Sequence, residues 1–376
     1  MPRMLYLDHA ATSPLRPEAR EAMAPYLGER FGNPSGVHGM SRRAKNAVEE
    51  ARERAAALLG AGRPLDVVFT GGGTESDNLG VAGPALAAGR GGVVVSAVEH
   101  EAVLETARFL ARLGCPVSFT PVDGEGRVSP DAVASSVGPA TAVVSVMAAN
   151  NETGARQPVA KVAEAVRDAA PGAVVHSDAV QAFVSDDVTV GALGADLVTI
   201  AAHKFGGPKG VGVLCVAGDI RLEPVLHGGG QEMGRRSGTH DVAGIVGMVA
   251  AMEAAVADRE RLRRDAGEAR RRFEARLADA LGATPTVADD RLVQHSHLRI
   301  PGVDAETMLI RLDALGVAAS AGSACQSGAV EVSHVLEAMG LAPDAAVECL
   351  RFSFGWTTAP DDGDEAAEAV IEAASR

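Results

Sequence analysis

The sequence is poor in several features that would assign it to a specialised class. Its 376 residues include four cysteines, one tryptophan and 3% aromatic residues. The cysteines form no Cys-x-x-Cys pair and lack zinc-ligand spacing, so we expect neither a disulfide framework nor a metal site. Charge interrupts every long apolar run before membrane-spanning length, and the first residues contain no secretory apolar segment. We therefore expect a cytoplasmic protein without a membrane partner.

An excess of positive charge is also missing. The formal net charge is −14, which argues against direct nucleic-acid binding, because nucleic-acid-binding domains present basic patches. The abundant residues are apolar ones, at 47% of the chain, and glycine, with 43 positions. With so few aromatic residues, the core must be mainly aliphatic. The length allows one large domain and one smaller domain.

Apolar runs and helical patterns alternate along the first two thirds of the chain. This alternation predicts an α/β fold with a mainly parallel sheet covered by helices on both faces. In such sheets ligands bind beyond the carboxyl ends of the strands. Five chemically apt residues fall just after predicted strands: Thr74, His100, Asn151, Asp178 and Lys204.

A long helical stretch over 241–281 separates this region from the rest of the chain. We interpret it as the bridge to a second domain, whose predicted elements lie between residues 292 and 374. The expected division is a large domain of residues 16–245 and a small domain of residues 1–15 and 246–376.

Lys204 lies in an unusual setting. Two short apolar runs, 197–201 and 210–216, predict buried strands on either side of His203, Lys204 and a glycine- and proline-rich turn. An isolated loop lysine is usually a solvated surface residue. A lysine held in a partly dry, glycine-lined site instead suits a Schiff base with pyridoxal phosphate (PLP).

The segment Gly71-Gly72-Gly73-Thr74-Glu75-Ser76 leads from a predicted strand into a helix. Glycines before a helix expose backbone N–H groups at the positive end of the helix dipole, which favours phosphate binding. The segment lacks the G-x-G-x-x-G spacing of dinucleotide sites and the Gly-Lys-Ser/Thr of a P-loop. A flexible turn is the alternative.

Asp178 follows an apolar run and lies 26 residues before Lys204 (204 − 178 = 26), which allows both to reach one sheet edge. A carboxylate there could keep the PLP pyridine nitrogen protonated, with Gln181 close to the ring's phenolic oxygen. A helix N-cap is the alternative for Asp178. His100 could stack on the ring or transfer protons, although a lone histidine is more often structural.

Two residues of the C-terminal third are candidates for substrate chemistry. Cys325 lies in a loop of small residues, which suits an accessible thiolate, whereas Cys115, Cys215 and Cys349 have the pattern of buried small hydrophobes. Arg351 interrupts an apolar strand and could bind a substrate carboxylate. A buried structural ion pair is an equally good interpretation of Arg351.

Together these residues resemble the cysteine desulfurases, PLP enzymes of the class V aminotransferase type, over nearly the whole chain. The Gly-Ser-Ala-Cys loop is similar to that of group I enzymes, the NifS/IscS kind, and the group II pattern Arg-x-Gly-His-His-Cys is absent. The motifs that carry the resemblance are Tyr6-Leu7-Asp8-His9-Ala10-Ala11-Thr12, Phe31-Gly32-Asn33-Pro34-Ser35, Thr74-Glu75-Ser76-Asp77-Asn78, Glu99-His100, Asn150-Asn151-Glu152, Asp178 with Gln181, His203-Lys204, Arg235-Arg236-Ser237-Gly238-Thr239, Gly322-Ser323-Ala324-Cys325 and Arg351-Phe352-Ser353.

The resemblance implies PLP fold type I, with a mainly parallel seven-stranded sheet in the large domain and a smaller α+β domain, in a homodimer. It implies conversion of L-cysteine to L-alanine, with Lys204 and His100 catalytic and the sulfur carried as a Cys325 persulfide to an acceptor protein. Implied PLP contacts are Gly73, Thr74, His100, Asp178, Gln181, His203, Lys204 and, from the other subunit, Thr239. Implied substrate contacts are Asn33, Asn151 and Arg351.

The sequence departs from the family pattern at Ala201, where a Ser or Thr phosphate ligand is usual, so we expect weaker PLP retention. Housekeeping members engage an iron–sulfur scaffold through a longer tail than the one expected here after the last predicted helix, so the resemblance leaves the sulfur acceptor open. A selenocysteine lyase or another class V lyase or aminotransferase is the first alternative function. A non-catalytic sulfur carrier or assembly partner is the second.

Overall fold

A seven-stranded sheet forms the centre of the larger part of the molecule, in a computed structural model that describes residues 4–321 and 333–376. Strand β8 (Gly212–Val216) runs antiparallel to both of its neighbours, β2 (Val67–Thr70) and β7 (Leu197–Ala201), and the other pairings of the sheet are parallel, so the predicted mainly parallel sheet is confirmed. The turn between β7 and β8 is too short for the crossover that parallel strands require. The strands lie in the order β2 (Val67–Thr70), β8 (Gly212–Val216), β7 (Leu197–Ala201), β6 (Val174–Asp178), β5 (Thr141–Ser145), β3 (Gly92–Ser96) and β4 (Val117–Thr120).

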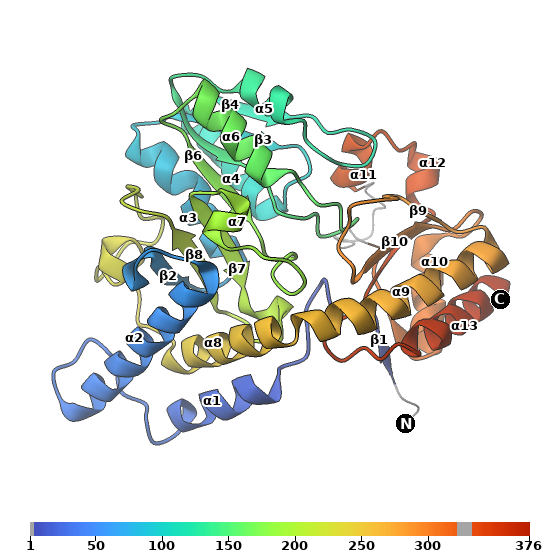
Figure 1. The fold of residues 1–376 in the computed structure, drawn as a ribbon, viewed down its shortest axis with the longest axis horizontal. Helices are drawn as coiled ribbons and strands as arrows, with labels where there is room; N and C mark the ends of the chain where they lie inside the picture. Colours follow the sequence, from blue (N-terminus) through green and yellow to red (C-terminus); the bar gives the residue numbers. More distant parts are fainter. Residues whose placement is uncertain (1–3, 322–332) are drawn as a thin grey trace.

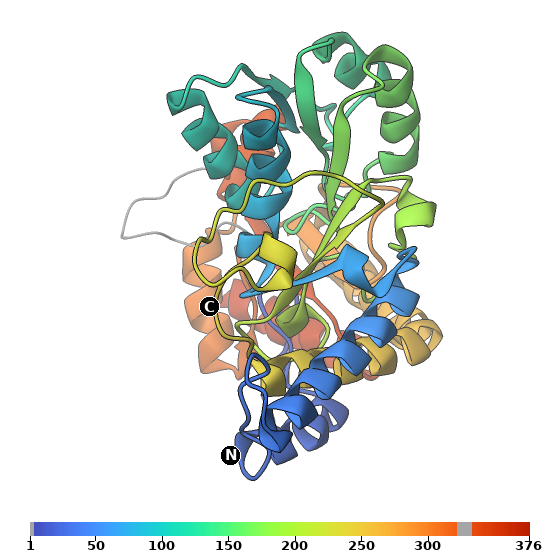
Figure 2. The same cartoon turned by 90° about the vertical axis from the view of Figure 1, so that its left-hand side faces the viewer.

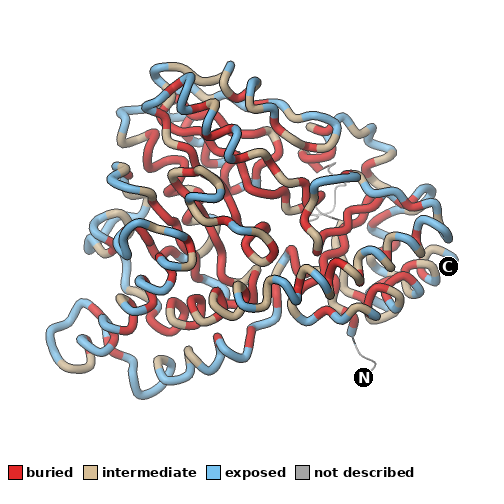
Figure 3. The backbone as a smooth tube through the Cα atoms, viewed as in Figure 1, coloured by how far each residue is buried: buried red, intermediate tan, exposed pale blue. Residues whose placement is uncertain are grey.

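Helices cover both faces of this sheet (Figures 1 and 2). Because side chains alternate between the faces of a strand, Val93 and Val95 pack with α3 and α4, whereas Val94 belongs to the core on the opposite face. The strands are buried almost throughout (Figure 3), except for the edge strand β4, where Ser118 and Phe119 are exposed. One face carries α3 (Gly73–Ala87) and α4 (Glu101–Arg112), and the other carries α2 (Gly39–Leu59), α5 (Pro130–Ser136), α6 (Val159–Ala169) and α8 (Val242–Ala257).

Shorter elements complete this part of the molecule. Helix α1 (Pro17–Leu27) lies along α8, and the loop from α1 to α2 extends at the lower left of Figure 1. The others are η1 (Pro64–Asp66), α7 (Val190–Leu193), η2 (Ala202–Lys204) and η3 (Glu232–Gly234).

A second hydrophobic core joins the start of the chain to its last third. The chain start contributes β1 (Leu5–Tyr6), which pairs in parallel with β11 (Val317–Ala318). The rings of Phe352 and Phe354 lie 4.8 Å and 5.9 Å from that of Phe273 in this core. The remaining elements are α9 (Arg259–Leu281), β9 (Thr284–Pro285), β10 (His295–Arg299), α10 (Ala305–Ala314), α11 (His334–Ala338), α12 (Pro343–Ala346), β12 (Cys349–Ser353) and α13 (Asp362–Ser375), with β10 between β9 and β12 in an antiparallel sheet.

The predicted single helix over 241–281 is wrong in detail, because α8 and α9 meet at Asp258. The backbone of Asp258 has φ −84° and ψ −5°. Its carboxylate accepts hydrogen bonds from Arg16 and Arg261, both at 2.8 Å. Buried residues of α8 as far as Ala255 belong to the larger core, and those of α9 from Leu262 belong to the smaller one. This packing supports a domain junction at Asp258 rather than at residue 245, and the two-domain division stays a proposal.

Candidate active site

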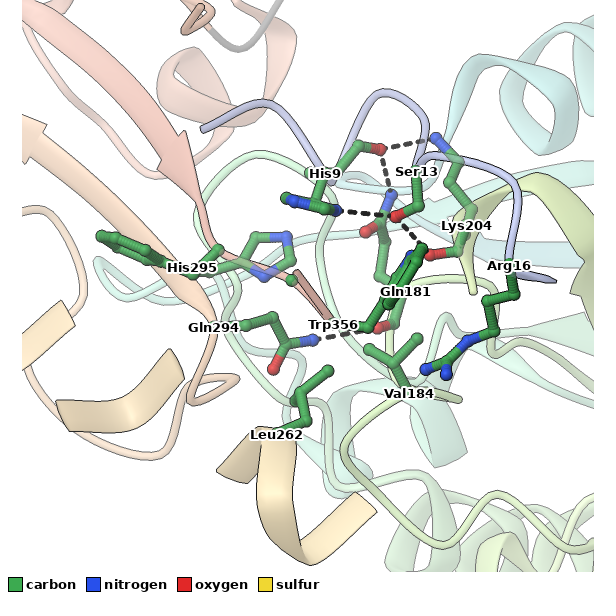
Figure 4. Close-up of a pocket in the computed structure, with 13 residues that line it drawn as sticks. His9, Ser13, Arg16, Gln181, Val184, Lys204, Leu262, Gln294, His295 and Trp356 are labelled. Carbon is green, nitrogen blue, oxygen red and sulfur yellow. Dashed lines mark hydrogen bonds between the residues drawn. The ribbon is translucent and has the colours of Figure 1, made fainter. Parts of the chain in front are cut away.

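Lys204 lies at the end of η2, directly after β7, as its position between two predicted strands indicated. Its Nζ donates hydrogen bonds to the carbonyl oxygens of Ala10 at 2.6 Å and Ala11 at 2.9 Å. The Ser13 hydroxyl donates to the Lys204 carbonyl oxygen at 3.0 Å. The N-terminal loop therefore contacts both the side chain and the main chain of Lys204 (Figure 4).

The ammonium form of Lys204 is disfavoured in this setting. Burial lowers the pKa of Lys204 to about 8, with a further contribution from the positive charge of Arg351, while Asp178 and Asp8 oppose the shift. Near pH 8, a substantial fraction of the protein molecules then carries Lys204 as the neutral amine. The neutral amine is the nucleophilic form that Schiff-base chemistry requires.

Asp178 is the last residue of β6 and is buried. One carboxylate oxygen accepts a hydrogen bond from the backbone N–H of Val180 at 2.9 Å. Burial raises the pKa of Asp178, and the charges of His100 and Lys204 act against that rise. A cationic ring nitrogen placed against Asp178 would remove this penalty, so the residue fits the expected partner of the PLP nitrogen.

Gln181 lies close to the lysine through a shared acceptor. Its Nε2 donates to the Ala10 carbonyl oxygen at 2.9 Å, the same oxygen that accepts from Lys204. Both side chains are thus held by one backbone group of the N-terminal loop.

Two further carboxylates, those of Glu99 and Asp77, lie buried near Asp178, and no role was predicted for either. Glu99 accepts hydrogen bonds from the Ser96 hydroxyl at 2.6 Å and from the Met147 N–H at 2.7 Å. Burial raises the pKa of Glu99 to about 8, and it raises that of Asp77 well above its usual range. At neutral pH we therefore expect a proton on Glu99, and burial also favours the protonated form of Asp77.

The start of α3 has the geometry of a phosphate cradle. Gly72 adopts φ +139°, which L side chains rarely adopt, and α3 begins at the next residue. Among the described residues none accepts a hydrogen bond from the N–H groups of Gly73, Thr74 or Glu75. A Cβ placed on Gly73 would lie 3.2 Å from the Cβ of Ala201, so β7 and the cradle are adjacent. These features fit a phosphate next to the lysine.

The two histidines of the expected site are held by different contacts. His100 is the N-cap of α4, where its Nδ1 accepts from the Ala102 N–H at 3.1 Å, which assigns the proton of the neutral ring to Nε2. His203 shares a 3.2 Å hydrogen bond with the Thr12 hydroxyl. Burial, together with Lys204 and Lys209, lowers the pKa of His203 to about 4, so this ring is neutral at physiological pH.

Arg351 is engaged by groups of the chain itself. Its Nη2 lies 2.9 Å from the carboxylate of Asp8, and its Nη1 donates to the backbone oxygen of Asn151 at 2.9 Å. The structure therefore contains the ion pair that was one of the two interpretations of Arg351. It also places Asn151 beside Arg351, as two groups that bind one carboxylate must be. Asp8 belongs to the Tyr6-Leu7-Asp8 motif, the only signal by which the sequence could have indicated it.

Other candidates are not brought to Lys204 within one chain. Asn33 is exposed in the loop between α1 and α2, where its side chain accepts from the Ser35 N–H at 3.0 Å. Thr239 is exposed in the loop before α8. Cys325 lies outside the described residues. The other cysteines, Cys115, Cys215 and Cys349, are buried as predicted.

A small cavity of about 20 Å³ lies behind Lys204 (Figure 4). Its wall includes Gln294 and His295 of the second core and His9 of the N-terminal loop. Among the described residues, neither ring nitrogen of His295 nor Oε1 of Gln294 has a hydrogen-bond partner. The volume is sufficient for about one water molecule between polar groups.

The described residues show neither a metal cluster nor a membrane span. Within 4–321 and 333–376, no group of three or more His, Cys, Asp and Glu side chains could hold a metal ion. No helix in the same ranges is long and apolar enough to cross a membrane.

Comparison with known proteins connects this site to one family. The family model described as aminotransferase class-V matches residues 5–365. A relative named cysteine desulfurase IscS, from Dictyoglomus turgidum, is 41% identical over 368 residues, which cover 96% of this chain and 92% of the relative.

Solved structures agree with the sequence relatives. A NifS-like protein superposes with a TM-score of 0.93 at 33% identity and covers 99% of this chain and 100% of its own. The structure titled "SspA in complex with cysteine" superposes with a TM-score of 0.81 at 31% identity, over 93% of this chain and 98% of its own.

Proposed function

This chain belongs to the cysteine desulfurases of the class-V aminotransferase family, and we propose that its desulfuration of L-cysteine depends on PLP bound covalently at Lys204. Enzymes of this family are PLP-dependent. The observation that carries the proposal is the position of Lys204, a half-buried amine of lowered pKa beside Asp178 and next to the start of α3.

The residues that would hold the cofactor surround this lysine. The N–H groups of Gly73 and Thr74 and the ring of His203 would bind the phosphate, with Thr239 supplied by a second copy of the chain. Asp178 would pair with the ring nitrogen, Gln181 would donate to the phenolic oxygen, and His100 would lie against the ring. When bound, PLP supplies an electron sink for the carbon that carries the amino group of the substrate.

Each of the remaining residues has a role set by its own chemistry. Arg351 and Asn151, with Asn33, would orient the carboxylate of cysteine. Lys204 would move a proton at Nζ, because its lowered pKa makes both protonation states accessible near pH 8. His100 would donate or accept a proton at Nε2, since its Nδ1 is held by the backbone of α4.

The sulfur acceptor in this proposal is Cys325. Its thiolate attacks the sulfur of the bound cysteine, a sulfur–sulfur bond forms, and the carbon–sulfur bond breaks with its electron pair left on carbon. Protonation of that carbon gives alanine, so no external oxidant is needed. The persulfide then passes its outer sulfur to an acceptor protein.

Two variants test this assignment. Lys204→Ala should lose the visible absorption of the protein–cofactor complex. Cys325→Ser should keep the absorption and release no sulfide from cysteine, while Cys115→Ser, at a buried cysteine away from the chemistry, should stay active. Full activity of Cys325→Ser would exclude the persulfide step. Alanine release from cysteine and from selenocysteine, measured in parallel, distinguishes the desulfurase from a selenocysteine lyase.

We also propose that the enzyme is a cytoplasmic homodimer. Large apolar side chains are exposed on and around the α1–α2 loop, where Leu27, Phe31 and Val37 are 71%, 77% and 89% exposed. Met233, six residues before Thr239, is also exposed. Burial of this surface against a second copy would bring the loop of Thr239 to the partner's site. Light scattering on the protein as it elutes from a size-exclusion column should give twice the mass of one chain.

A further inference from the structure

The guanidinium of Arg351 is only partly satisfied by the chain. It is buried, its Nη2 pairs with Asp8 at 2.9 Å, and its Nη1 is bound by the Asn151 carbonyl oxygen. Its Nε has no hydrogen-bond partner among the described residues. A buried guanidinium with an unpaired N–H can gain a further acceptor, which a substrate carboxylate would supply.

Asp8 differs from Arg351 in how firmly it is held. Its backbone is fixed, because it forms a bridge with Ser353 and its carbonyl oxygen accepts from the Tyr6 hydroxyl at 3.1 Å. Its side chain is 21% exposed, against 5% for Arg351. The Asp8 carboxylate can therefore turn toward solvent while the main chain stays in place.

Arg351 already has a carboxylate counter-ion, Asp8, without any ligand. Lys204 and Arg351 are the two cations, and Asp8 and Asp178 are the two anions that influence the lysine. An incoming carboxylate adds a further anion beside Arg351, next to Asp8. Two carboxylates that face one buried guanidinium repel each other, so the newcomer binds best when Asp8 moves aside.

We propose that Asp8 is a specificity-determining residue: its carboxylate occupies Arg351 in the resting enzyme, and the carboxylate of the substrate must displace it. This proposal rests on the proposed function, in which Arg351 binds the carboxylate of cysteine. Asp8 thereby lowers the affinity of the site for every small carboxylate. A cysteine molecule overcomes the competition because its amino group and sulfur make additional contacts, which a simple acid lacks.

The inference is tested with the PLP-loaded Asp8→Asn enzyme, which keeps the shape of the side chain and removes its charge. The KM for L-cysteine should fall about five- to tenfold while kcat changes less than twofold, since the competition concerns substrate binding. Propanoate, a carboxylate without an amino group or sulfur, should inhibit the variant with a Ki at least tenfold lower than that of the parent. Propanamide, its uncharged analogue, should show no such gain.

A matched control exists on the surface. Asp219 also pairs with an arginine, Arg63, at 2.9 Å, and is 91% exposed. Asp219→Asn should leave the KM and the propanoate Ki unchanged.

Arg351→Gln separates this inference from the assignment on which it rests. An unchanged KM in Arg351→Gln overturns the carboxylate-binding role of Arg351. A raised KM in Arg351→Gln supports the carboxylate-binding role of Arg351. If Asp8→Asn then shows an unchanged or raised KM and an unchanged or raised propanoate Ki, only the proposed role of Asp8 is overturned, and Asp8 is a residue that orients Arg351. If Asp8→Asn does not fold, Asp8→Ser provides the same comparison, with the same outcomes for and against.

Discussion

The hydroxyl of Ser333 donates a 2.6 Å hydrogen bond to Glu152 and so joins two buried residues that lie 181 positions apart. Ser333 is also the N-cap of α11, where its oxygen accepts from the N–H groups of Val335 and Leu336. Burial raises the pKa of Glu152, and the bond from Ser333 is the largest opposing influence. One side chain thus caps α11 and satisfies a carboxylate next to Asn151.

Ser333→Ala should therefore destabilise the protein by about 2 kcal/mol, since a lost N-cap costs about 1 kcal/mol and an unsatisfied buried acceptor costs a similar amount. Urea unfolding monitored by circular dichroism measures the change. Ser375→Ala, which removes an exposed hydroxyl bonded to a backbone carbonyl, is the control and should be nearly neutral. Equal stability of the two variants would contradict the double role of Ser333 as the N-cap of α11 and the hydrogen-bond donor to Glu152.

Ala201→Ser should tighten the binding of PLP. Ala201 lies beside the start of α3, where a serine hydroxyl could donate to the phosphate. One such charge-assisted hydrogen bond contributes about 1.5–3 kcal/mol, or roughly tenfold or more in Kd. Equilibrium dialysis of PLP against the cofactor-free protein measures the gain. Ala202→Ser is the control, because the Cβ of this buried residue lies next to Gly207 rather than next to the start of α3, so its Kd for PLP should not fall. An unchanged Kd for Ala201→Ser would show that the missing ligand is replaced by other groups.

Stability of the cofactor-free protein should depend on pH through Lys204. Burial holds the pKa of Lys204 at about 8 in the folded protein, below its ordinary value of 10.5. Between these two values the unfolded chain binds more protons, so the contribution of the lysine to stability becomes more favourable as pH rises. Lys204→Met should be more stable than the parent at pH 7, by up to about 3 kcal/mol, and this advantage should disappear near pH 10.5. A pH-independent difference would mean that the folded protein holds the ammonium without penalty.

Glu99 should produce the opposite slope. Its pKa is raised from 4.5 to about 8 in the folded protein, so between pH 4.5 and 8 the folded state holds a proton that the unfolded chain releases. Its contribution to stability is lost as pH rises through this window. Glu99→Gln should remove the loss, with a difference of roughly 4 kcal/mol between the ends of the window. Glu105→Gln, on the surface of α4, should follow the parent. Parallel pH profiles for the parent and Glu99→Gln would argue against a protonated Glu99.

Much of the fold could be predicted because its strands are buried runs between turn residues. The predicted strand over 197–201 has the bounds of β7, and the predicted strand over 210–216 contains β8. Helices α7 and α12 span four residues each, too few for a helical period to be recognised. The break at Asp258 depends on Arg16, a partner 242 positions away, which no local pattern reveals.

The site was predicted less completely than the fold. The positions of Lys204, Asp178 and the start of α3 followed from strand ends, because all parallel strands open at one edge. The pairing of Asp8 with Arg351 spans 343 positions and reflects tertiary packing alone. The sequence indicated Arg351 in β12 but not its counter-ion, Asp8.

The pairing of β1 with β11, and of Asp8 with Ser353, sets an order for folding on the ribosome. The chain emerges from its N-terminus, so Leu5 and Asp8 are made among the first residues, yet their partners are Val317 and Ser353. The strands of the central sheet are all complete by Val216. The N-terminal segment therefore stays unpaired while the sheet forms. The carbonyl groups of Ala10 and Ala11, which accept hydrogen bonds from Lys204, reach their final positions only when synthesis is nearly finished. A nascent chain that stalls before residue 351 would contain the lysine and the cradle but no Arg351, and so could not bind its substrate.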